Sequence, residues 1–553
     1  MTTPRHDRRT FLRAGAATAA TAATITTLSS GAAAASDDDA APGARNRPRR
    51  EVEELTVGEM AAGMASGELT SRRLVSAYRA RIRRLDRGRV DLRSVIELNP
   101  EALSVARELD RERRQGNVRG PLHGIPVLLK DNIDTDPHLD GGIGTTAGSL
   151  ALVDSRPGGD ATLTARLRAA GAVILGKANL SEWANFRGFQ SSSGWSAVGG
   201  ACRNPVVLDR NPCGSSSGSA AAVAASLAAV ALGTETDGSI VCPASACGIV
   251  GIKPTVGLTS RAGVVPISRT QDTVGPMGRT VADAAAVLGV LTGVDERDPA
   301  TAESEGNSFD DYTRFLDHDG LTGARIGVAR QLFFNSPETT AIMDRVVAAL
   351  PDLGVEVVDP VEFPSFDEFT NASPEFDVLL LEFKSDIEAY LATRDGGPRT
   401  LADLIAFNDA NAETELKWFG QEIFGLSEAT GGVDDPDYPG KLADSLRISR
   451  DEGLDAVLDA NGLDAIIAPT GSPAWPTDLV GGDAFIGGTS SYAAMAGYPL
   501  VTVPMGDSFG LPVGLTFMGR RWSEPTLIKL ASGFEANLGA RTPPAYLTTL
   551  PRH

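Results

Sequence analysis

Two turns rich in glycine and serine hold the residue types that nucleophilic chemistry requires. The first is Pro212-Cys213-Gly214-Ser215-Ser216-Ser217-Gly218-Ser219, and the second is Gly233-Thr234-Glu235-Thr236-Asp237-Gly238-Ser239-Ile240. Glycines beside hydroxyls permit unusual backbone angles and let main-chain N–H groups approach a ligand, as an oxyanion-binding turn requires. An apolar segment that we expect to be a buried helix, Ser219 to Leu232, separates the turns, whereas flexible Gly/Ser linkers are not normally interrupted in this way. We therefore expect a catalytic site here.

A lysine upstream could supply the base that such a serine needs. Lys130 ends the apolar run Val127-Leu128-Leu129, and burial at the end of a strand would lower its pKa toward neutrality. The ordinary alternative is a strand-end lysine that reaches solvent, and for Lys177 and Lys253 we expect surface or ion-pairing roles. For Lys130, the serine turns downstream favour the role of base.

A histidine is a weaker candidate than Lys130 for the catalytic base. The five histidines stand at 6, 123, 138, 318 and 553, and a turn or packing role is at least as plausible as catalysis for His123. Residues 214 to 218 also match the G-x-S-x-G nucleophile elbow with Ser216 as the nucleophile. An elbow follows a buried strand and needs a downstream histidine, but Asn211-Pro212-Cys213 precedes this one and only His318 or His553 follows. The elbow is the weaker hypothesis.

Over about residues 70 to 540, the sequence resembles the amidase signature family. Three features carry the resemblance: a lysine that ends the first core strand, a Gly-Ser-Ser-Gly-type turn, and a Gly-Ser-Ile turn whose serine lies twenty-four residues after Ser215. The resemblance implies Lys130 as base, Ser215 as a bridging serine held by a cis peptide bond, and Ser239 as nucleophile. It implies an oxyanion hole made by the main-chain N–H groups of Thr236, Asp237, Gly238 and Ser239.

Two departures from the commoner family pattern indicate the peptide amidase branch: Asp237 and Ser217 stand where many members have glycine. The resemblance implies hydrolysis of carboxamides to carboxylate and ammonia through an acyl-enzyme, with C-terminal peptide amides as one substrate class. One alternative is a component similar to the amidase-type chain of tRNA-dependent amidotransferases, which works in the cytosol with partner subunits. Another is an exported binding protein without turnover, which would have no need for a nucleophile beside an oxyanion turn.

Composition excludes several other classes. The formal charge is −20, and because the first 35 residues carry four Arg and one Asp, the rest of the chain carries about −23, which opposes binding to nucleic acid or anionic lipid. The four cysteines, at 202, 213, 242 and 247, have no C-x-x-C spacing and no nearby histidine, so a zinc site is unsupported. No phosphate-binding loop is present either. We expect no cofactor and no metal, and we leave disulfides and oligomeric state open.

Residues 1–35 have the three-part pattern of an export signal. Arg8-Arg9-Thr10-Phe11-Leu12-Arg13 is followed by a weakly apolar Ala/Thr stretch and by small residues around Ala33 and Ala35, which resembles a twin-arginine signal. The stretch is too rich in Thr, Ser and Gly for a membrane span. We expect export by this route, with residues 36–50 as a linker.

Strand-like and helical segments alternate from about residue 120 onward, which favours an α/β fold in one large domain, residues 51–545. We expect a helical lead-in (51–115), a core (120–300), an acidic helical cap section (359–458) and C-terminal strands (461–520) that return to the same sheet. The resemblance implies a mixed β-sheet covered by helices.

Overall fold

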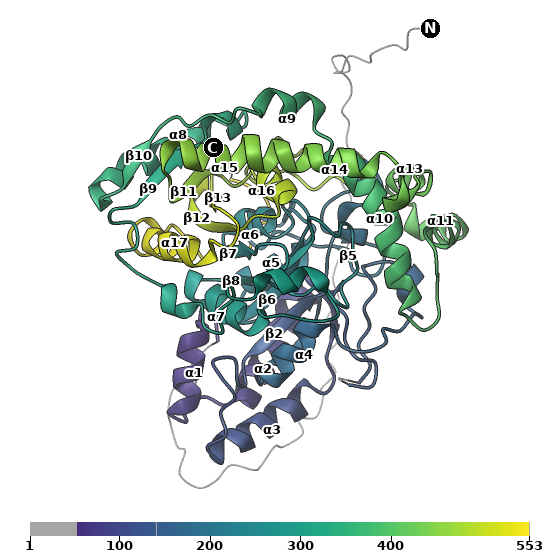
Figure 1. The fold of residues 1–553 in the computed structure, drawn as a ribbon. Helices are drawn as coiled ribbons and strands as arrows, with labels where there is room; N and C mark the ends of the chain where they lie inside the picture. The colour runs from purple at the N-terminus through teal and green to yellow at the C-terminus, as the bar shows by residue number, and fades with distance from the viewer. Residues whose placement is uncertain (1–51, 140, 552–553) are drawn as a thin grey trace, which may run out of the picture. The chain divides into compact units, whose positions relative to one another are not determined.

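A mixed sheet of eleven strands runs through the described part of the protein, residues 52–139 and 141–551 of a computed structural model (Figure 1). The strand order is β1-β3-β2-β6-β8-β7-β12-β13-β11-β9-β10. This confirms the expected α/β class with a mixed sheet. The bounds are β1 Val95–Leu98, β2 Pro126–Lys130, β3 Val173–Ala178, β6 Val230–Glu235, β7 Val250–Lys253, β8 Thr273–Gly278, β9 Arg325–Val328, β10 Glu356–Val358, β11 Ala465–Pro469, β12 Leu500–Ser508 and β13 Leu511–Met518.

Strand direction changes along the sheet. Strand β2 runs parallel to both of its neighbours, β3 and β6, and β9 runs parallel to β10 and β11. Between these two parallel groups, β6, β8, β7, β12, β13 and β11 pair antiparallel in turn. Every residue of β2, β3, β6 and β11 is buried. Strands covered on both faces read as continuous apolar runs, which is why these strands are visible in the sequence.

Helices cover the sheet along its length, and α2 and α3 lie beside the early strands while α8 and α17 pack on β12. The helices are α1 Val57–Ala65, α2 Ser71–Arg81, α3 Ala102–Arg114, α4 Thr162–Ala169, α5 Ser217–Ala224, α6 Val241–Cys247, α7 Val281–Leu291, α8 Pro337–Ala349, α9 Phe366–Ala372, α10 Glu375–Ala392, α11 Leu401–Ala410, α12 Ala412–Glu415, α13 Glu422–Glu428, α14 Tyr438–Leu446, α15 Asp455–Asn461, α16 Ser491–Ala496 and α17 Glu524–Leu538. Among them, none has the length and apolarity needed to cross a bilayer.

The segment between the two serine turns differs from its predicted form. The expected helix over Ser219 to Leu232 stops at Ala224, and strand β6 begins at Val230. A continuous apolar run has no periodicity that separates a buried helix from a buried strand, so the prediction was wrong for its second half. All eight residues of α5 are buried. A Cβ on Gly218 would lie 2.3 Å from the carbonyl oxygen of Ser94, so this helix packs too closely for a larger residue.

The amino-terminal region is less purely helical than expected. Strand β1 lies inside the predicted helical lead-in and pairs antiparallel with β3 at the edge of the sheet. Its burial does not alternate, since Val95 is buried and Glu97 exposed and the register shifts between them, so the sequence shows no period of two here. A short hairpin of β4 (Trp195–Ser196) and β5 (Gly200–Ala201) was not predicted either.

Helices α9 to α15 occupy the acidic stretch between β10 and β11, in green in Figure 1. The longest of them, α10, has eighteen residues and presents Leu379 and Leu380 to a cluster with Phe383 and Phe424. The expected export signal at 1–35 and the linker at 36–50 lie outside the described residues.

Candidate active site

Lys130, at the end of β2, is fully buried among hydroxyl groups. Its Nζ lies 2.7 Å from Ser215 Oγ and 2.8 Å from Thr234 Oγ1, and it donates to the Thr234 carbonyl oxygen at 3.2 Å. Burial lowers its pKa to about 7, although the charges of Asp272 and Glu235 act to raise it. An amine with a pKa this close to neutral can take a proton at ordinary pH, which an exposed lysine cannot.

Ser215, whose hydroxyl contacts Lys130, lies in the first serine turn. The peptide bond joining Gly214 to Ser215 is cis, as the family resemblance implies. Ser215 is fully buried. The neighbouring Ser216 donates its main-chain N–H to the carbonyl oxygen of Ser239 at 3.2 Å, so one backbone hydrogen bond ties the two turns together.

Ser239 lies on the turn between β6 and α6, and it lines an open cavity of about 440 Å³. The turn has a left-handed residue, Gly238, with φ 76°, where a side chain would be strained. The buried carboxylate of Glu235 closes the turn from below, accepting the N–H of Ile240 at 2.7 Å and that of Val241 at 3.0 Å. Two features of the sequence therefore set the position of Ser239: Gly238, which permits the left-handed backbone, and the Glu235 carboxylate, which binds the N–H groups after the turn.

The amide groups of this turn are available to a ligand. Asp237, Gly238 and Ser239 lie in the loop between β6 and α6. Within the described residues, their main-chain N–H groups have no backbone hydrogen-bond acceptor. The Asp272 carboxylate holds the start of the turn by accepting the Thr236 hydroxyl at 2.6 Å. Donors held in place in this way can stabilise an oxyanion without reorganisation.

Asp237, one of the residues that departs from the commoner pattern, anchors the turn to α16. Its two carboxylate oxygens accept the hydroxyls of Ser490 at 2.5 Å and Ser491 at 2.6 Å. Burial and the charge of Asp237 raise the pKa of nearby Glu375 to about 8. Two side-chain contacts therefore hold the turn: Asp272, just before β8, bonds Thr236, and Asp237 bonds the serines at the start of α16.

The cavity beside Ser239 is polar at the turn and apolar at its walls. Its aromatic and aliphatic lining comes from four separate parts of the chain, and includes Phe186, Phe189, Leu379, Ile423, Trp475 and Phe485. Phe189 and Phe485 are largely exposed, at 63% and 47%, so they lie at the mouth. Such a cavity accepts an apolar group that ends in a polar, reacting one.

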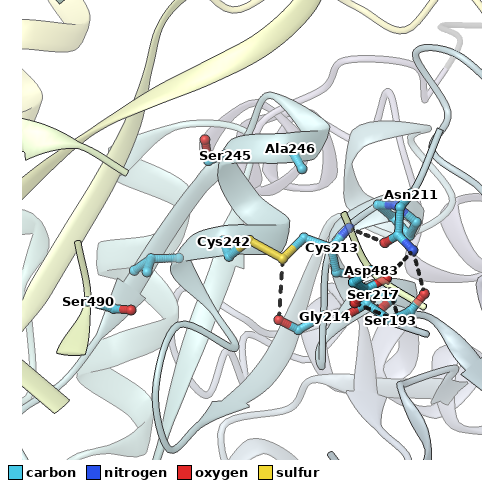
Figure 2. Close-up of a disulfide and its surroundings, with 12 residues drawn as sticks. Ser193, Asn211, Cys213, Gly214, Ser217, Cys242, Ser245, Ala246, Asp483 and Ser490 are labelled. Atoms are coloured by element: carbon cyan, nitrogen blue, oxygen red, sulfur yellow. Dashed lines mark hydrogen bonds between the residues drawn. A yellow bond between two sulfur atoms is a disulfide. The ribbon is translucent and has the colours of Figure 1, made fainter. Parts of the chain in front are cut away.

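A disulfide joins Cys213 to Cys242 in the wall of this cavity (Figure 2). Cys213 immediately precedes the Gly214–Ser215 bond, and Cys242 follows Ser239 by three residues, so the bridge connects the two serine turns covalently. Figure 2 also shows Asp483, which accepts from Asn211 Nδ2 at 3.2 Å and from the Ser193 N–H at 3.0 Å. The remaining cysteines, 202 and 247, are buried and unpaired.

Ser216 and His123, the weaker candidates for catalysis, do not line the substrate cavity. Ser216 is fully buried, and its hydroxyl donates to the Thr234 carbonyl at 3.1 Å and accepts the Thr234 N–H at 3.2 Å. It does not line the cavity. His123 is buried against the Leu109 carbonyl oxygen at 3.0 Å, in a packing role.

We expected surface or ion-pairing roles for Lys177 and Lys253; both are fully buried, and Lys177 forms an ion pair. Lys177 has Asp131 as its ionic partner, at 4.0 Å, and Lys253 donates to the Tyr498 carbonyl at 2.8 Å. Within the described residues, no cluster of three or more His, Cys, Asp and Glu side chains is placed to hold a metal.

Sequence reasoning missed four polar residues around the site: Asn132, Thr234, Glu235 and Asp272. Thr234 and Glu235 end a buried strand directly before the Gly-Ser turn, and Asn132 follows Lys130 by two residues. Their positions in the sequence could have marked them. Asp272 directly precedes β8, far along the chain, and only the antiparallel pairing of β6 with β8 brings it near Thr236.

Comparison with known proteins identifies the family. A family model described as Amidase matches residues 73–528. The chain belongs to the amidase family. It is 54% identical to a peptide amidase whose crystal structure contains the competitive inhibitor chymostatin, with a TM-score of 0.86 over 89% of this chain and 99% of that one. It is also 43% identical to a probable amidase of Arabidopsis thaliana, over 90% of this chain and 92% of the relative.

One chain of the glutamyl-tRNA(Gln) amidotransferase of Chloroflexus aurantiacus is 36% identical, over 88% of this chain and 97% of the relative. The family and the peptide amidase neighbours show that this protein is an amide-hydrolysing enzyme with the amidase signature fold.

Proposed function

We propose that the protein is an exported serine amidase in which Ser239 is the nucleophile, Ser215 relays a proton and Lys130 is the base. One observation carries the proposal. The fully buried Lys130 ammonium group, with a pKa lowered to about 7, hydrogen-bonds Ser215 at 2.7 Å, and Ser215 belongs to the turn that is tied to Ser239. A base near neutrality linked to a nucleophile turn is the arrangement that activates a hydroxyl.

In the first half of the reaction, Ser239 Oγ attacks the carbonyl carbon of R–CO–NH₂ while its proton passes through the Ser215 hydroxyl to Lys130 Nζ. The resulting oxyanion accepts hydrogen bonds from the main-chain N–H groups of the 236–239 turn. Loss of one such donor costs about 10²–10³ in rate in serine hydrolases. Collapse of the intermediate breaks the C–N bond, and the proton returns from Lys130 through Ser215 to the nitrogen, which leaves as NH₃.

The second half hydrolyses the acyl-enzyme. A water attacks the ester carbonyl and gives one proton along the same relay to Lys130. Ser239 Oγ recovers that proton as the ester C–O bond breaks, and the released R–COOH loses its own proton to the solvent to give R–COO⁻. The same groups act as base and then as acid in both halves, so no other ionisable side chain is required.

For the substrate, we propose amides whose acyl part is apolar and extended, with C-terminal peptide amides as the leading class. The apolar walls of the 440 Å³ cavity and its aromatic mouth support this, and so does the 54% identity to a peptide amidase. Ammonia release from purified mature protein, measured over aliphatic, aromatic and peptide amides, tests it. The proposal fails if short aliphatic amides are preferred over every peptide amide.

The nucleophile is tested by a fluorophosphonate probe, which phosphonylates an activated serine. Mass spectrometry is expected to place the label on Ser239, and Ser239→Ala should abolish it. The matched control is Ser216→Ala, because Ser216 hydrogen-bonds backbone outside the cavity and should retain most labelling. An inactive Ser216→Ala together with a labelled Ser239→Ala would establish the elbow mechanism instead. No labelling at all would favour a binding protein.

The amidotransferase alternative rests on the 36% identity to a chain of that enzyme. The greater identity to peptide amidase and the acidic charge of the protein oppose it. A stand-alone amidase releases ammonia without any partner. A requirement for a partner protein or for tRNA would support the alternative.

Export through residues 1–35 is proposed from the arginine pair and the pattern around it. Changing Arg8 and Arg9 to Lys should leave the precursor in the cytoplasm, as fractionation would show. Secretion of the double variant through the same route would contradict the proposal.

A further inference from the structure

The wall of the substrate cavity carries negative charge and no positive charge. Among the described residues that line the cavity, two are carboxylates, Asp237 and Asp483, and none is Lys, Arg or His. Both oxygens of Asp237 accept serine hydroxyls at the start of α16, so this carboxylate already holds the nucleophile turn. Asp483 is therefore the charged group of the wall that a substrate can meet.

Asp483 has neutral hydrogen-bond donors around it and no cation. Its Oδ1 accepts the Trp475 indole N–H at 3.0 Å, Asn211 Nδ2 at 3.2 Å and the Ser193 main-chain N–H at 3.1 Å. Burial raises the pKa of the Asp483 carboxyl, and in the described part of the chain the groups that oppose this rise, Ser193 and Trp475, are both neutral. A carboxylate withdrawn from water without a counter-charge is unfavourable, so this one indicates a cationic ligand.

The second oxygen, Oδ2, keeps the capacity to accept a further hydrogen bond. Among the described residues its one donor is the Ser193 N–H, at 3.0 Å, and Oδ1 shares that donor. Asp483 is half-buried and lines the cavity, so a group that enters the cavity can reach its side chain. A cationic donor forms a shorter and stronger hydrogen bond with a carboxylate than a neutral donor does. Oδ2 is the atom at which such a donor would bind.

Aromatic rings lie beside this carboxylate. Trp475, which donates to Asp483, is in edge contact with Phe485, with ring centroids 5.5 Å apart, and both residues line the cavity. Aromatic faces attract ammonium groups, and this attraction adds to that of a carboxylate. The same wall repels an anionic group, because no lysine or arginine lines it.

The neighbours of Asp483 place it close to the first serine turn. Its donor Ser193 packs against Gly214, since a Cβ on Gly214 would lie 3.1 Å from the Ser193 Cβ. Gly214 directly precedes Ser215 and lines the same cavity. One packing contact therefore separates the carboxylate's donor from the turn that carries the proposed relay, so a short peptide can reach both.

We propose that Asp483 binds the protonated amino terminus of a short peptide amide and so makes the enzyme selective for peptide amides with a free amino terminus. The inference rests on the proposed amidase function and names its substrate more narrowly. The apolar walls receive the peptide side chains, Ser239 attacks the carbonyl of the terminal carboxamide, and Asp483 holds the opposite end. Because Asp483 contacts a group remote from the reacting bond, its contribution belongs to KM rather than to kcat.

Two substrates that differ in one group test the inference. One is alanyl-phenylalaninamide, and the other is isobutyryl-phenylalaninamide, in which a methyl group takes the place of the ammonium group. The unaltered enzyme is expected to prefer the alanyl substrate about tenfold in kcat/KM, as the strength of a hydrogen bond between charged groups implies. Asp483→Asn should abolish that preference by raising KM on the alanyl substrate about tenfold, with little change on the isobutyryl substrate.

Asp483→Asn should fold, because an amide oxygen at the position of Oδ1 keeps the hydrogen bonds from Trp475, Asn211 and Ser193. Asp478→Asn is the matched control. Asp478 is exposed and accepts the main-chain N–H groups of Val480 and Gly481, outside the lining of the cavity. Its replacement removes the same charge from the protein, and neither substrate should be affected.

Equal losses of Asp483→Asn on both substrates would show that Asp483 only supports the wall, and would overturn the inference. An unchanged KM on the alanyl substrate, or an equal rise for Asp478→Asn, would overturn it as well. If Asp483→Asn does not fold, the unaltered enzyme decides, because equal kcat/KM on the two substrates contradicts an ammonium site. Failure of the proposed function is distinguishable, since then the unaltered enzyme hydrolyses neither substrate.

Discussion

Two neighbouring strands, β2 and β3, each carry a buried lysine near their carboxyl ends, and the two lysines have different surroundings. Lys130 pairs in register with Ala178, and Lys177 pairs with Leu129. Burial lowers the pKa of both. Both lysines hydrogen-bond neutral groups, Lys130 two hydroxyls and a carbonyl oxygen and Lys177 the Thr145 hydroxyl and the Ile133 carbonyl oxygen, but Lys177 also has the Asp131 carboxylate at 4.0 Å.

This difference shows what makes a lysine a base. A carboxylate close by compensates part of the ammonium charge, so Asp131 acts to raise the pKa of Lys177, which burial lowers. The hydroxyls and the carbonyl oxygen around Lys130 satisfy its hydrogen bonds but carry no negative charge to compensate the ammonium group. One residue of register therefore separates the lysine that we propose as the base from a lysine with a carboxylate partner.

The largest expected effect comes from exchanging each lysine for methionine, which keeps the apolar stem. Lys130→Met should lose about 10²–10⁴ in kcat/KM, the usual contribution of a general base, and should stay folded because only neutral partners are left. Lys177→Met should instead destabilise the protein by about 3–5 kcal/mol, because Asp131 then becomes an unpaired buried charge. Steady-state kinetics and thermal unfolding of both variants measure this. The comparison is wrong if the two variants lose the same activity at the same stability.

Ser215→Ala should be milder than Lys130→Met, because a water can take the place of the bridging hydroxyl. The Ser215→Ala, Lys130→Met double variant should be hardly worse than Lys130→Met alone, since members of one catalytic unit are not additive. Single-turnover acylation rates of the three variants would measure the coupling. Additive losses would mean that Ser215 acts independently of Lys130.

The pH profile is the next test of the comparison. Because the pKa of Lys130 is lowered to about 7, its neutral, proton-accepting form is present above that pH and is lost below it. The value of kcat/KM should therefore fall about tenfold per pH unit below neutrality. Its measurement from pH 5 to 9 shows the midpoint. A plateau extending down to pH 5 would contradict Lys130 as the base.

Asp272→Asn sharpens that profile. The charge of Asp272 raises the pKa of Lys130, so its removal should shift the midpoint to lower pH. The shift is the informative quantity, since Asp272 also holds Thr236 and any change in the maximal rate could arise there. An unchanged midpoint would show that the charge of Asp272 does not affect the pKa of Lys130.

The smallest effect is expected for Thr234→Val, which removes the Oγ1 that contacts both Lys130 and Asn132. One hydrogen bond contributes about 1 kcal/mol, so a loss of about fivefold in kcat is expected. Stopped-flow acylation kinetics would resolve a change of this size. A loss as large as that of Lys130→Met would show that Thr234 itself handles the proton.

Much of this molecule could be read from the sequence because its central strands are short apolar runs bounded by turns. The strand end at Lys130 was predicted, and β2 ends there. The stretch 219–232 was not, because an unbroken apolar run suits a buried helix and a buried strand equally. The burial of Lys177 and Lys253 was also missed, since whether a strand end reaches solvent depends on what covers it.

The sequence by itself determined the family, the two serine turns and the lysine that precedes them, because these depend on residue types at short, fixed spacings. Only the tertiary structure decided that Lys130 is buried among hydroxyl groups, that Cys213 and Cys242 are joined, and that Asp272 and Asn132 lie beside the site. Some of these are contacts between segments 102 residues apart, such as Asn132 and Thr234. Local pattern carries no information about them, because strand pairing sets such distances and the surrounding burial sets the electrostatics that follow.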